Sequence, residues 1–342
     1  MRAYSFFVVL GLTLLVGCVP ESTTPDDPFP VIPAHLPPVP FPADNPITRD
    51  KAELGRHLFY EGRLARDGKT SCSSCHAQEN AFSDAPHQVS QGFEGQQGQR
   101  NSPMIVNAAY RKSFFWDGRA ASLEDQAMAA FLNPIEMAAD TIAVAELMRS
   151  APYREMWLRA FNDTTVNMYR VMQAIATFER TLVSANSRYD RFVRGDTTVL
   201  TAQERHGMQL YFSDRTMCSS CHGGPDLTND EFMNVGLFHH YFDRGRFEVT
   251  RNPLDEAKFK TPSLRNVALT PPYMAGGDSE DGLLETLESV VEHYNKGGTT
   301  FHNKDKRVRK LDLTESEKSA LVAFMKTFTD SSILTEPRFA RP

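Results

Sequence analysis

The chain has 342 residues, of which 41% are hydrophobic and 23% are charged. This is an ordinary globular composition, and the length allows two compact domains with their own cores. The formal net charge of −6 lacks the basic excess on which nucleic-acid binding depends, so we expect no nucleic-acid partner.

The N-terminal segment predicts export and a lipid anchor. After Arg2, an apolar run extends to Val16 and is too short to span a bilayer, which is typical of a signal peptide. The next letters, Leu-Val-Gly-Cys, resemble a bacterial lipoprotein box. We therefore expect residues 1–17 to be a signal peptide and Cys18 to carry lipid, which would anchor the protein to a membrane in the periplasm or cell envelope. The alternative is an ordinary secretory signal with an incidental cysteine.

A proline-rich segment follows, and residues 18–46 are expected to form an extended tether behind the lipid. Ten of the chain's 21 prolines lie in this segment, and proline can neither continue a helix nor donate to a strand ladder. No later segment has a long uninterrupted apolar run, so we predict no transmembrane helix in the mature chain.

Beyond the tether, helical periodicity predominates and strand signals are weak. Residues 48–64 and 200–216 each predict a helix, and each is followed by the pentad Cys-Ser-Ser-Cys-His. Thr201 and Glu204 predict a capping box at the start of the second helix. Further helices are predicted from apolar periodicity in four segments: 122–132, 144–161, 168–185 and 313–330, the last with a cap from Thr314 and Glu317.

The repeated pentad carries the chemistry. A Cys-x-x-Cys pair alone can bind zinc, exchange disulfides or hold covalent haem. A four-cysteine zinc site needs no histidine, and a thioredoxin-like motif would use one pair at a strand-to-helix junction. In Cys-x-x-Cys-His the two thiols add to the haem vinyl groups and the histidine becomes the proximal iron ligand. We therefore expect two covalently bound haem c groups, held by Cys72, Cys75, His76, Cys218, Cys221 and His222.

These patterns together predict a mostly α fold with two cytochrome c-like haem domains and long loops, related as an internal repeat. We place the first domain at residues 47–194 and the second at 195–335, because the helical pattern is interrupted near residues 190–200.

Two further stretches, residues 101–137 and 259–273, resemble the bacterial di-haem cytochrome c peroxidases and their MauG-type relatives. With both pentads, the resemblance covers about residues 46–330. It implies that the first haem reacts with peroxide and that the second relays electrons. It also implies site residues by position: Trp116 between the haems, Gln126 and Glu136 on the distal side of the first haem, and Asn101, Thr270 and Pro272 around a calcium ion.

The implied chemistry is sensible for these residue types. Heterolytic cleavage of H2O2 requires a proton to move from the inner to the outer oxygen, which a carboxylate can do while an amide orients the peroxide. Each residue also has a plainer interpretation. Glu136 could be a solvated helix-end carboxylate, Gln126 a helix-surface amide, and Trp116 a core residue.

The sequence departs from the family pattern at both irons. Relatives that need reductive activation have a removable distal histidine sixteen residues after the proximal one, and that position is Gly92 here. The nearest histidine, His87, is read as loop surface, so the first haem should be five-coordinate. On the second haem, Tyr294 occupies the position of the distal methionine, as in MauG-type enzymes; the alternatives are Met274, His293 or no distal ligand. The histidine of the family's "PY-aromatic-HDG" stretch is replaced by Ala275.

Three functions follow from the sequence. The first is a cell-envelope peroxidase that reduces H2O2 to water with electrons from a small cytochrome c or cupredoxin. The second is a MauG-type oxidase that uses peroxide to oxidise a residue on a partner protein. The third is a non-catalytic di-haem electron carrier, which would need no distal acid–base pair such as Gln126 and Glu136.

Overall fold

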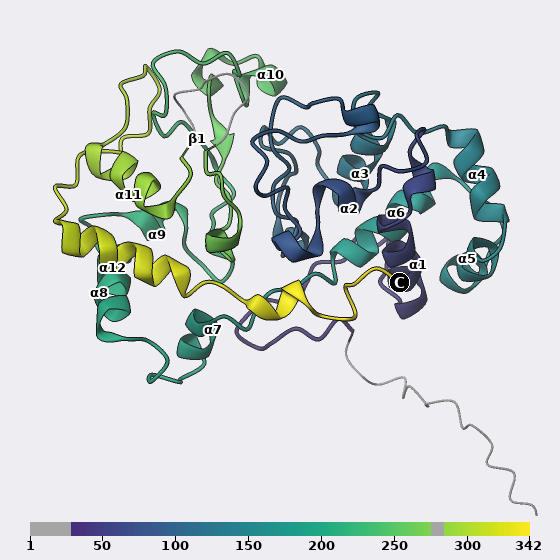
Figure 1. Ribbon diagram of the computed structural model, residues 1–342, viewed down its shortest axis with the longest axis horizontal. Coiled ribbons are helices and arrows are strands. Elements are labelled where there is room, and N and C mark those ends of the chain that lie inside the picture. Colours follow the sequence, from purple (N-terminus) through teal and green to yellow (C-terminus); the bar gives the residue numbers. More distant parts are fainter. Residues whose placement is uncertain (1–28, 275–283) are drawn as a thin grey trace, which may run out of the picture. The chain divides into compact units, whose positions relative to one another are not determined.

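A computed structural model describes residues 29–274 and 284–342, and residues 32–342 form one compact unit. The expected mostly α fold is confirmed, since the one sheet within these described ranges is small and pairs strand β1 (Phe232–Met233) with β2 (Phe259–Lys260) in antiparallel register. The helices are α1 (Arg49–Phe59), α2 (Cys72–Cys75), α3 (Leu123–Leu132), α4 (Thr141–Arg149), α5 (Tyr153–Phe161), α6 (Met168–Glu179), α7 (Arg188–Val193), α8 (Ala202–Tyr211), α9 (Cys218–Cys221), α10 (Phe247–Thr250), α11 (Leu287–Lys296) and α12 (Glu315–Lys326) (Figure 1).

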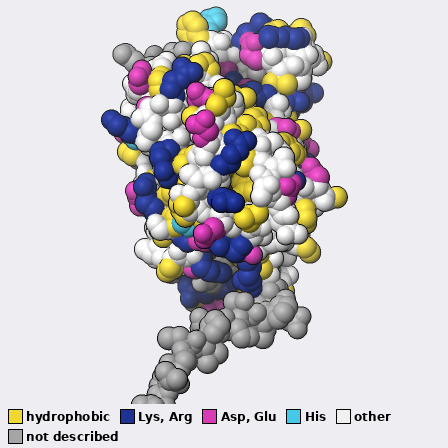
Figure 2. Space-filling model, turned by 90° about the vertical axis from the view of Figure 1, so that its right-hand side faces the viewer, with side chains coloured by type: hydrophobic (Ala, Val, Ile, Leu, Met, Phe, Trp, Pro, Cys, Tyr) yellow, Lys and Arg dark blue, Asp and Glu magenta, His cyan; other side chains and the backbone are white. Residues whose placement is uncertain are grey.

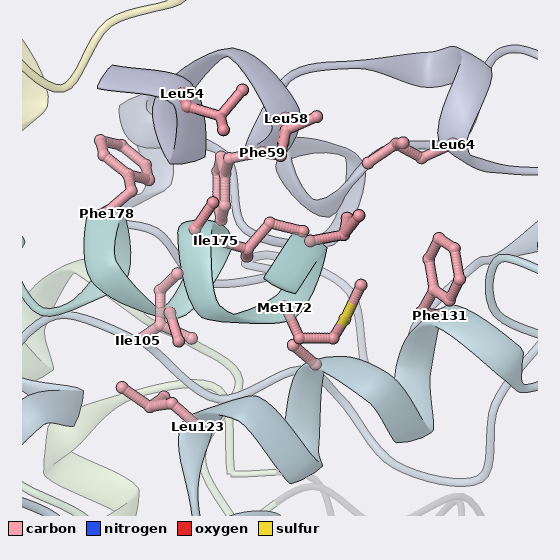
Figure 3. Packing of buried hydrophobic residues seen from close by; sticks show 14 of the residues in the cluster. Leu54, Leu58, Phe59, Leu64, Ile105, Leu123, Phe131, Met172, Ile175 and Phe178 are labelled. Carbon is pink, nitrogen blue, oxygen red and sulfur yellow. The ribbon is translucent and has the colours of Figure 1, made fainter. Parts of the chain in front are cut away.

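The first hydrophobic core lies between α1, α3 and α6. Leu54, Leu58 and Phe59 project from α1 toward Ile175 and Phe178 of α6, and all five side chains are buried (Figure 3). The α1 positions recur at helical spacing, which places them on one face of the helix. This core supports the first pentad, because Cys72 packs against its edge.

The second core lies between α8, α11 and α12. Tyr211 of α8 meets Phe324 and Phe328 in edge-to-face contacts, with ring centroids 5.3 and 5.7 Å apart. Such aromatic contacts stabilise a core beyond the area that they bury. Both capping boxes predicted from the sequence are confirmed, at the starts of α8 and α12, so these helices begin where the sequence places them.

In each core, the first helix crosses its partner at a glycine. A Cβ atom on Gly55 would lie 1.9 Å from the carbonyl oxygen of Ala174 in α6, and a Cβ on Gly207 would lie 1.9 Å from that of Ala320 in α12. Only glycine allows backbones to approach so closely. The two crossings therefore fix how α1 sits on α6 and how α8 sits on α12.

The segment before α1 differs from the expected tether. The sequence predicts an extended tether through residue 46, but Leu36 and Val39 are buried, and the Asn45 amide donates to Glu124 Oε1 at 2.6 Å and to Gln173 O at 3.0 Å. The apolar side chains between the prolines explain this packing, since they have surface to bury. Residues 1–28, which include the expected signal peptide and Cys18, lie outside the described part of the chain.

The surface mixes charges of both signs. On the face shown in Figure 2, Lys and Arg side chains are interspersed with Asp and Glu. Exposed ion pairs such as Arg170–Asp163, at 2.7 Å, contribute little to stability individually. In the described residues no helix has the length and apolar character needed to cross a membrane.

The glycine crossings make a stability prediction. Gly207→Ala should destabilise the second core by about 1–3 kcal/mol, because the new methyl group must push α12 away from α8. Thermal unfolding followed by circular dichroism measures the effect. Gln209→Ala, on the exposed side of the same helix, is the control and should leave the transition within about 0.5 kcal/mol of wild type. Equal stability of the two variants would contradict the close crossing.

Candidate active site

Each Cys-Ser-Ser-Cys-His pentad forms a single helical turn that ends at its histidine. The His76 amide donates to Cys72 O at 3.0 Å, and the His222 amide donates to Cys218 O at 2.9 Å. Helical spacing brings residues three and four apart onto one face. The two thiols and the imidazole of each pentad are therefore presented on the same side of the turn.

A backbone carbonyl fixes each histidine ring. His76 Nδ1 lies 3.2 Å from Phe82 O, and His222 Nδ1 lies 3.1 Å from Pro262 O. A ring whose Nδ1–H donates to a carbonyl has its Nε2 lone pair free for a metal. Burial lowers the pKa of both imidazoles to about 4, which keeps them in the neutral, metal-binding form.

Both pentads line one cavity of about 990 Å³. That volume is at the upper end of the range of about 300–1,000 Å³ for ligand pockets. Apart from the alternative ligand His293, the residues that the sequence nominates for the two haems and the calcium ion line this cavity: Cys72, Cys75, His76, Asn101, Trp116, Gln126, Glu136, Cys218, Cys221, His222, Thr270, Pro272, Met274 and Tyr294.

The cavity residues fit covalent haem. Burial raises the pKa of the Cys75 thiol to about 11 and raises that of the Cys218 thiol as well, so the sulfurs are neutral thiols. Within the described residues, no three or more His, Cys, Asp and Glu side chains are grouped to hold a bare metal ion. Thiol pairs beside an oriented imidazole, with apolar walls around them, suit an attached macrocycle whose iron takes Nε2.

Glu136 lies just beyond the C-terminus of α3, where Asn133 orients it. Asn133 caps the helix, and its Nδ2 donates to Glu136 Oε1 at 2.8 Å. Burial raises the pKa of Glu136, although the Asn133 bond and the charge of Arg119 lower it. A carboxyl group with a raised pKa, held through one oxygen, has its second oxygen available for proton transfer. Gln126 lies on the cavity-lining side of the same helix.

Gly92 is a residue whose importance the sequence analysis missed. A Cβ atom there would lie 2.2 Å from Ile135 O and 2.6 Å from Glu136 Cα, and the neighbouring Phe93 amide donates to Glu136 O at 2.6 Å. The loop therefore presses directly on the backbone of Glu136. The sixteen-residue count led to Gly92, but only the fold reveals that no side chain fits at this position.

His87 lies elsewhere in the same loop. Its side chain is 53% exposed, bonds to Asp84 Oδ1 at 3.0 Å, and does not line the cavity. This location agrees with its interpretation as loop surface.

Trp116 is held by hydrogen bonds to two segments that are far apart in the sequence, around Asn101 and around Lys260. Its indole Nε1 donates to Asn101 O at 3.0 Å, and its carbonyl oxygen accepts the amide of Lys260 in β2 at 2.8 Å. Asn101 Oδ1 is buried without a hydrogen-bond partner, as expected of an oxygen with room for a cation. Thr270 Oγ1, by contrast, donates to Val267 O at 3.3 Å.

The candidates for the second iron separate into two kinds. His293 Nε2 lies 3.1 Å from Val235 O, and this residue does not line the cavity. Tyr294 and Met274 both line it. Burial raises the pKa of Tyr294, and the charged forms of Cys221 and Cys218 would raise it further. Ala275 lies outside the described residues.

Glu179, at the end of α6, is a second residue that the sequence analysis missed. Its side chain lines the cavity near Cys72, yet Oε2 has no hydrogen-bond partner, and burial raises its pKa to about 8. Nothing in the local sequence marks this glutamate, because its burial arises from the packing of α6 against the first pentad.

Comparisons with known proteins agree with this site. The family model of di-haem cytochrome c peroxidase matches residues 49–198. Cytochrome-c peroxidase IdrP1 of Denitromonas iodatirespirans is 36% identical, over 96% of this chain and 93% of that protein. The methylamine utilization protein MauG of Methylorubrum extorquens is 35% identical, over 88% of this chain and 84% of its own length.

A solved structure shares the fold. The crystal structure of a MauG-like protein associated with microbial copper homeostasis has a TM-score of 0.84 and 35% identity, and the match covers 91% of this chain and 98% of that one. The chain belongs to the di-haem cytochrome c peroxidase family and is an oxidoreductase of the cytochrome-c peroxidase type. Membership implies haem cofactors.

The contact between Gly92 and Glu136 predicts a loss of turnover. Gly92→Ala should lower peroxide turnover about 10²-fold while keeping both haems, because the methyl group displaces the Glu136 backbone. Peroxidase assays and haem content measure the two effects. Gly98→Ala is the matched control: its Cβ would meet only the Ser90 hydroxyl, which can rotate away. Equal turnover of the two variants would show that the loop does not position Glu136.

Proposed function

We propose that the protein reduces H2O2 to water at the first haem, with electrons relayed through the second. The observation that carries this proposal is Glu136: a half-buried carboxyl with a raised pKa, oriented by Asn133, in the same cavity as His76. Such a group has a use where a substrate must exchange protons beside an iron, and a pure electron carrier would not need it.

The balance of the reaction is H2O2 with two electrons and two protons giving two waters. Haem, when bound, would supply the iron that binds peroxide and the electrons that reduce it. Glu136 Oε2 takes the proton from the inner peroxide oxygen and returns it to the outer one, which leaves as water. Gln126 donates its amide hydrogens to orient the peroxide, and the apolar walls of the cavity limit competing water.

Trp116 would carry electrons between the two haems when both are bound. Support comes from its carbonyl, which accepts from Lys260 of the second half, and from its indole, which bonds to Asn101 of the first. Trp116 lines the cavity that both pentads share, where an aromatic ring would shorten an electron path between bound haems. The external donor is a small cytochrome c or cupredoxin.

A MauG-type oxidase is the second candidate. Tyr294 beside the second pentad and Gly92 against Glu136 both favour it, since they suit a first haem without a distal protein ligand and a second haem with a phenolate. In that case peroxide is used to oxidise a residue on a partner protein rather than a small donor.

The arrangement of the halves is part of the proposal. We infer an internal repeat of two cytochrome c-like domains, residues 47–194 and 195–335, and the matched glycine crossings of Gly55 and Gly207 support it. We also infer a calcium ion near Asn101, Thr270 and Pro272, supported by the unpaired Asn101 Oδ1. Export to the periplasm or cell envelope, with lipid on Cys18, rests on the N-terminal sequence.

Glu136→Gln tests the acid–base role. Turnover of peroxide should fall about 10²- to 10⁴-fold with both haems retained, because glutamine cannot accept the proton. Glu155→Gln, at an exposed position on α5, is the matched control and should keep wild-type turnover. A Glu136→Gln protein with wild-type activity would rule out the role.

The pH profile gives an independent test. The base form of Glu136 is the active one, so kcat/KM should fall as pH drops through its pKa, which burial raises above the ordinary 4.5. The acid limb of the profile should therefore lie above pH 4.5 and disappear in Glu136→Gln. An acid limb that survives the substitution would assign it to another group.

The ligand of the second haem is tested by replacing its candidates in turn. Tyr294→Phe should raise the midpoint potential of one haem, since loss of a phenolate removes its stabilisation of ferric iron. Spectroelectrochemical titration should show at least a tenfold change in the reduced-to-oxidised ratio at fixed potential. Met274→Leu should leave that ratio unchanged. A changed ratio in Met274→Leu, with no change in Tyr294→Phe, would assign Met274 as the ligand.

A further inference from the structure

One cation in the cavity differs from the others in its partners. Lys260 lines the cavity, and among the lysines and arginines that do so in the described residues it is the one without a carboxylate within 4 Å. The other cavity cations and their partners are Arg100 with Asp117 and Asp243, Arg111 with Asp226, Arg119 with Asp117, Arg265 with Asp190, and Arg307 with Asp305.

Within the described residues, no carboxylate pairs directly with the Lys260 ammonium. Nζ donates to the carbonyl oxygen of Ser113 and lies 5.6 Å from the centroid of the Phe114 ring. Burial lowers its pKa to about 8, although the more distant Asp230 and Asp117 raise it. A desolvated ammonium without a counter-charge is costly, so its presence here points to an anion that occupies the cavity.

The backbone holds Lys260 firmly in this position. Its amide donates to Trp116 O at 2.8 Å, and Phe232 lies opposite it in the small sheet. Two residues further on, Pro262 O bonds to the ring of His222. The same short segment therefore orients the second proximal histidine and carries an ammonium to the residues around Trp116.

We propose that the Lys260 ammonium binds a propionate carboxylate of one of the two haems, at the junction beside Trp116. The inference rests on the proposed function to the extent that haem occupies the cavity. Each haem carries two propionates, so the ligand class supplies an anion that the described side chains do not place within 4 Å of Lys260. A lysine that neutralises this carboxylate also favours reduction of the nearby iron, because it lowers the local negative charge against which an electron is added.

Midpoint potentials of the holoprotein test the proposal without reference to peroxide turnover. In Lys260→Met, the reduced-to-oxidised ratio of one haem at fixed applied potential should fall on the order of tenfold, since the carboxylate loses its counter-charge. Lys260→Arg should restore most of the wild-type ratio. Lys310→Met removes a charge from a side chain that is 72% exposed and should change neither haem.

A purely structural role would give a different result. Lys260→Met would then lower the unfolding temperature with both potentials unchanged, and this would overturn the proposal, as would an equal shift in Lys260→Met and Lys260→Arg. Fewer than two haems per chain in the wild-type protein, by the pyridine haemochrome assay, would overturn the haem assignment together with this proposal. Unchanged potentials with two haems present would overturn this proposal alone.

A second measurement covers the case in which Lys260→Met does not fold. Resonance Raman spectra of wild type and Lys260→Arg should differ in the propionate bending mode, because a guanidinium and an ammonium bond differently to a carboxylate. Identical propionate frequencies in the two proteins would contradict the contact.

Discussion

The hydrogen bond from each proximal histidine to a backbone carbonyl is the constraint on which the site depends. His76 is held by Phe82 O and His222 by Pro262 O, and each bond directs the opposite ring nitrogen toward the cavity. The carbonyls belong to loops, so their positions depend on the helix pairs beneath them. The glycine crossings of α1 on α6 and of α8 on α12 set those pairs.

The groups that we propose for proton and electron transfer, Glu136 and Trp116, are held by different elements of the same cavity. Glu136 is positioned by Asn133 at the end of α3 and by the loop that presses Gly92 against its backbone. Trp116 is held on its other side by Lys260 of β2. Under the proposed function, substitutions can therefore alter proton chemistry and electron supply separately.

Much of this could be predicted from the sequence because it depends on local spacing. The pentads, the capping boxes of α8 and α12 and the mostly α fold are set by neighbouring residues. The extent of the tether was predicted wrongly, since proline content says nothing of the surface that Leu36 and Val39 find to bury. The importance of three further residues could not be predicted, because it depends on residues distant in sequence. Gly92 leaves no room for a side chain against Glu136, Glu179 Oε2 is buried without a hydrogen-bond partner, and Lys260 has no described carboxylate within 4 Å.

The central claim is that the first haem has no distal protein ligand while the second has one. An EPR spectrum of the fully oxidised protein, repeated after one equivalent of H2O2, tests it most directly. The account predicts a high-spin ferric signal beside a low-spin one, with the high-spin signal lost at once on adding peroxide. Two low-spin signals that do not respond until an electron is added would contradict it and would point to His87 as a displaceable ligand.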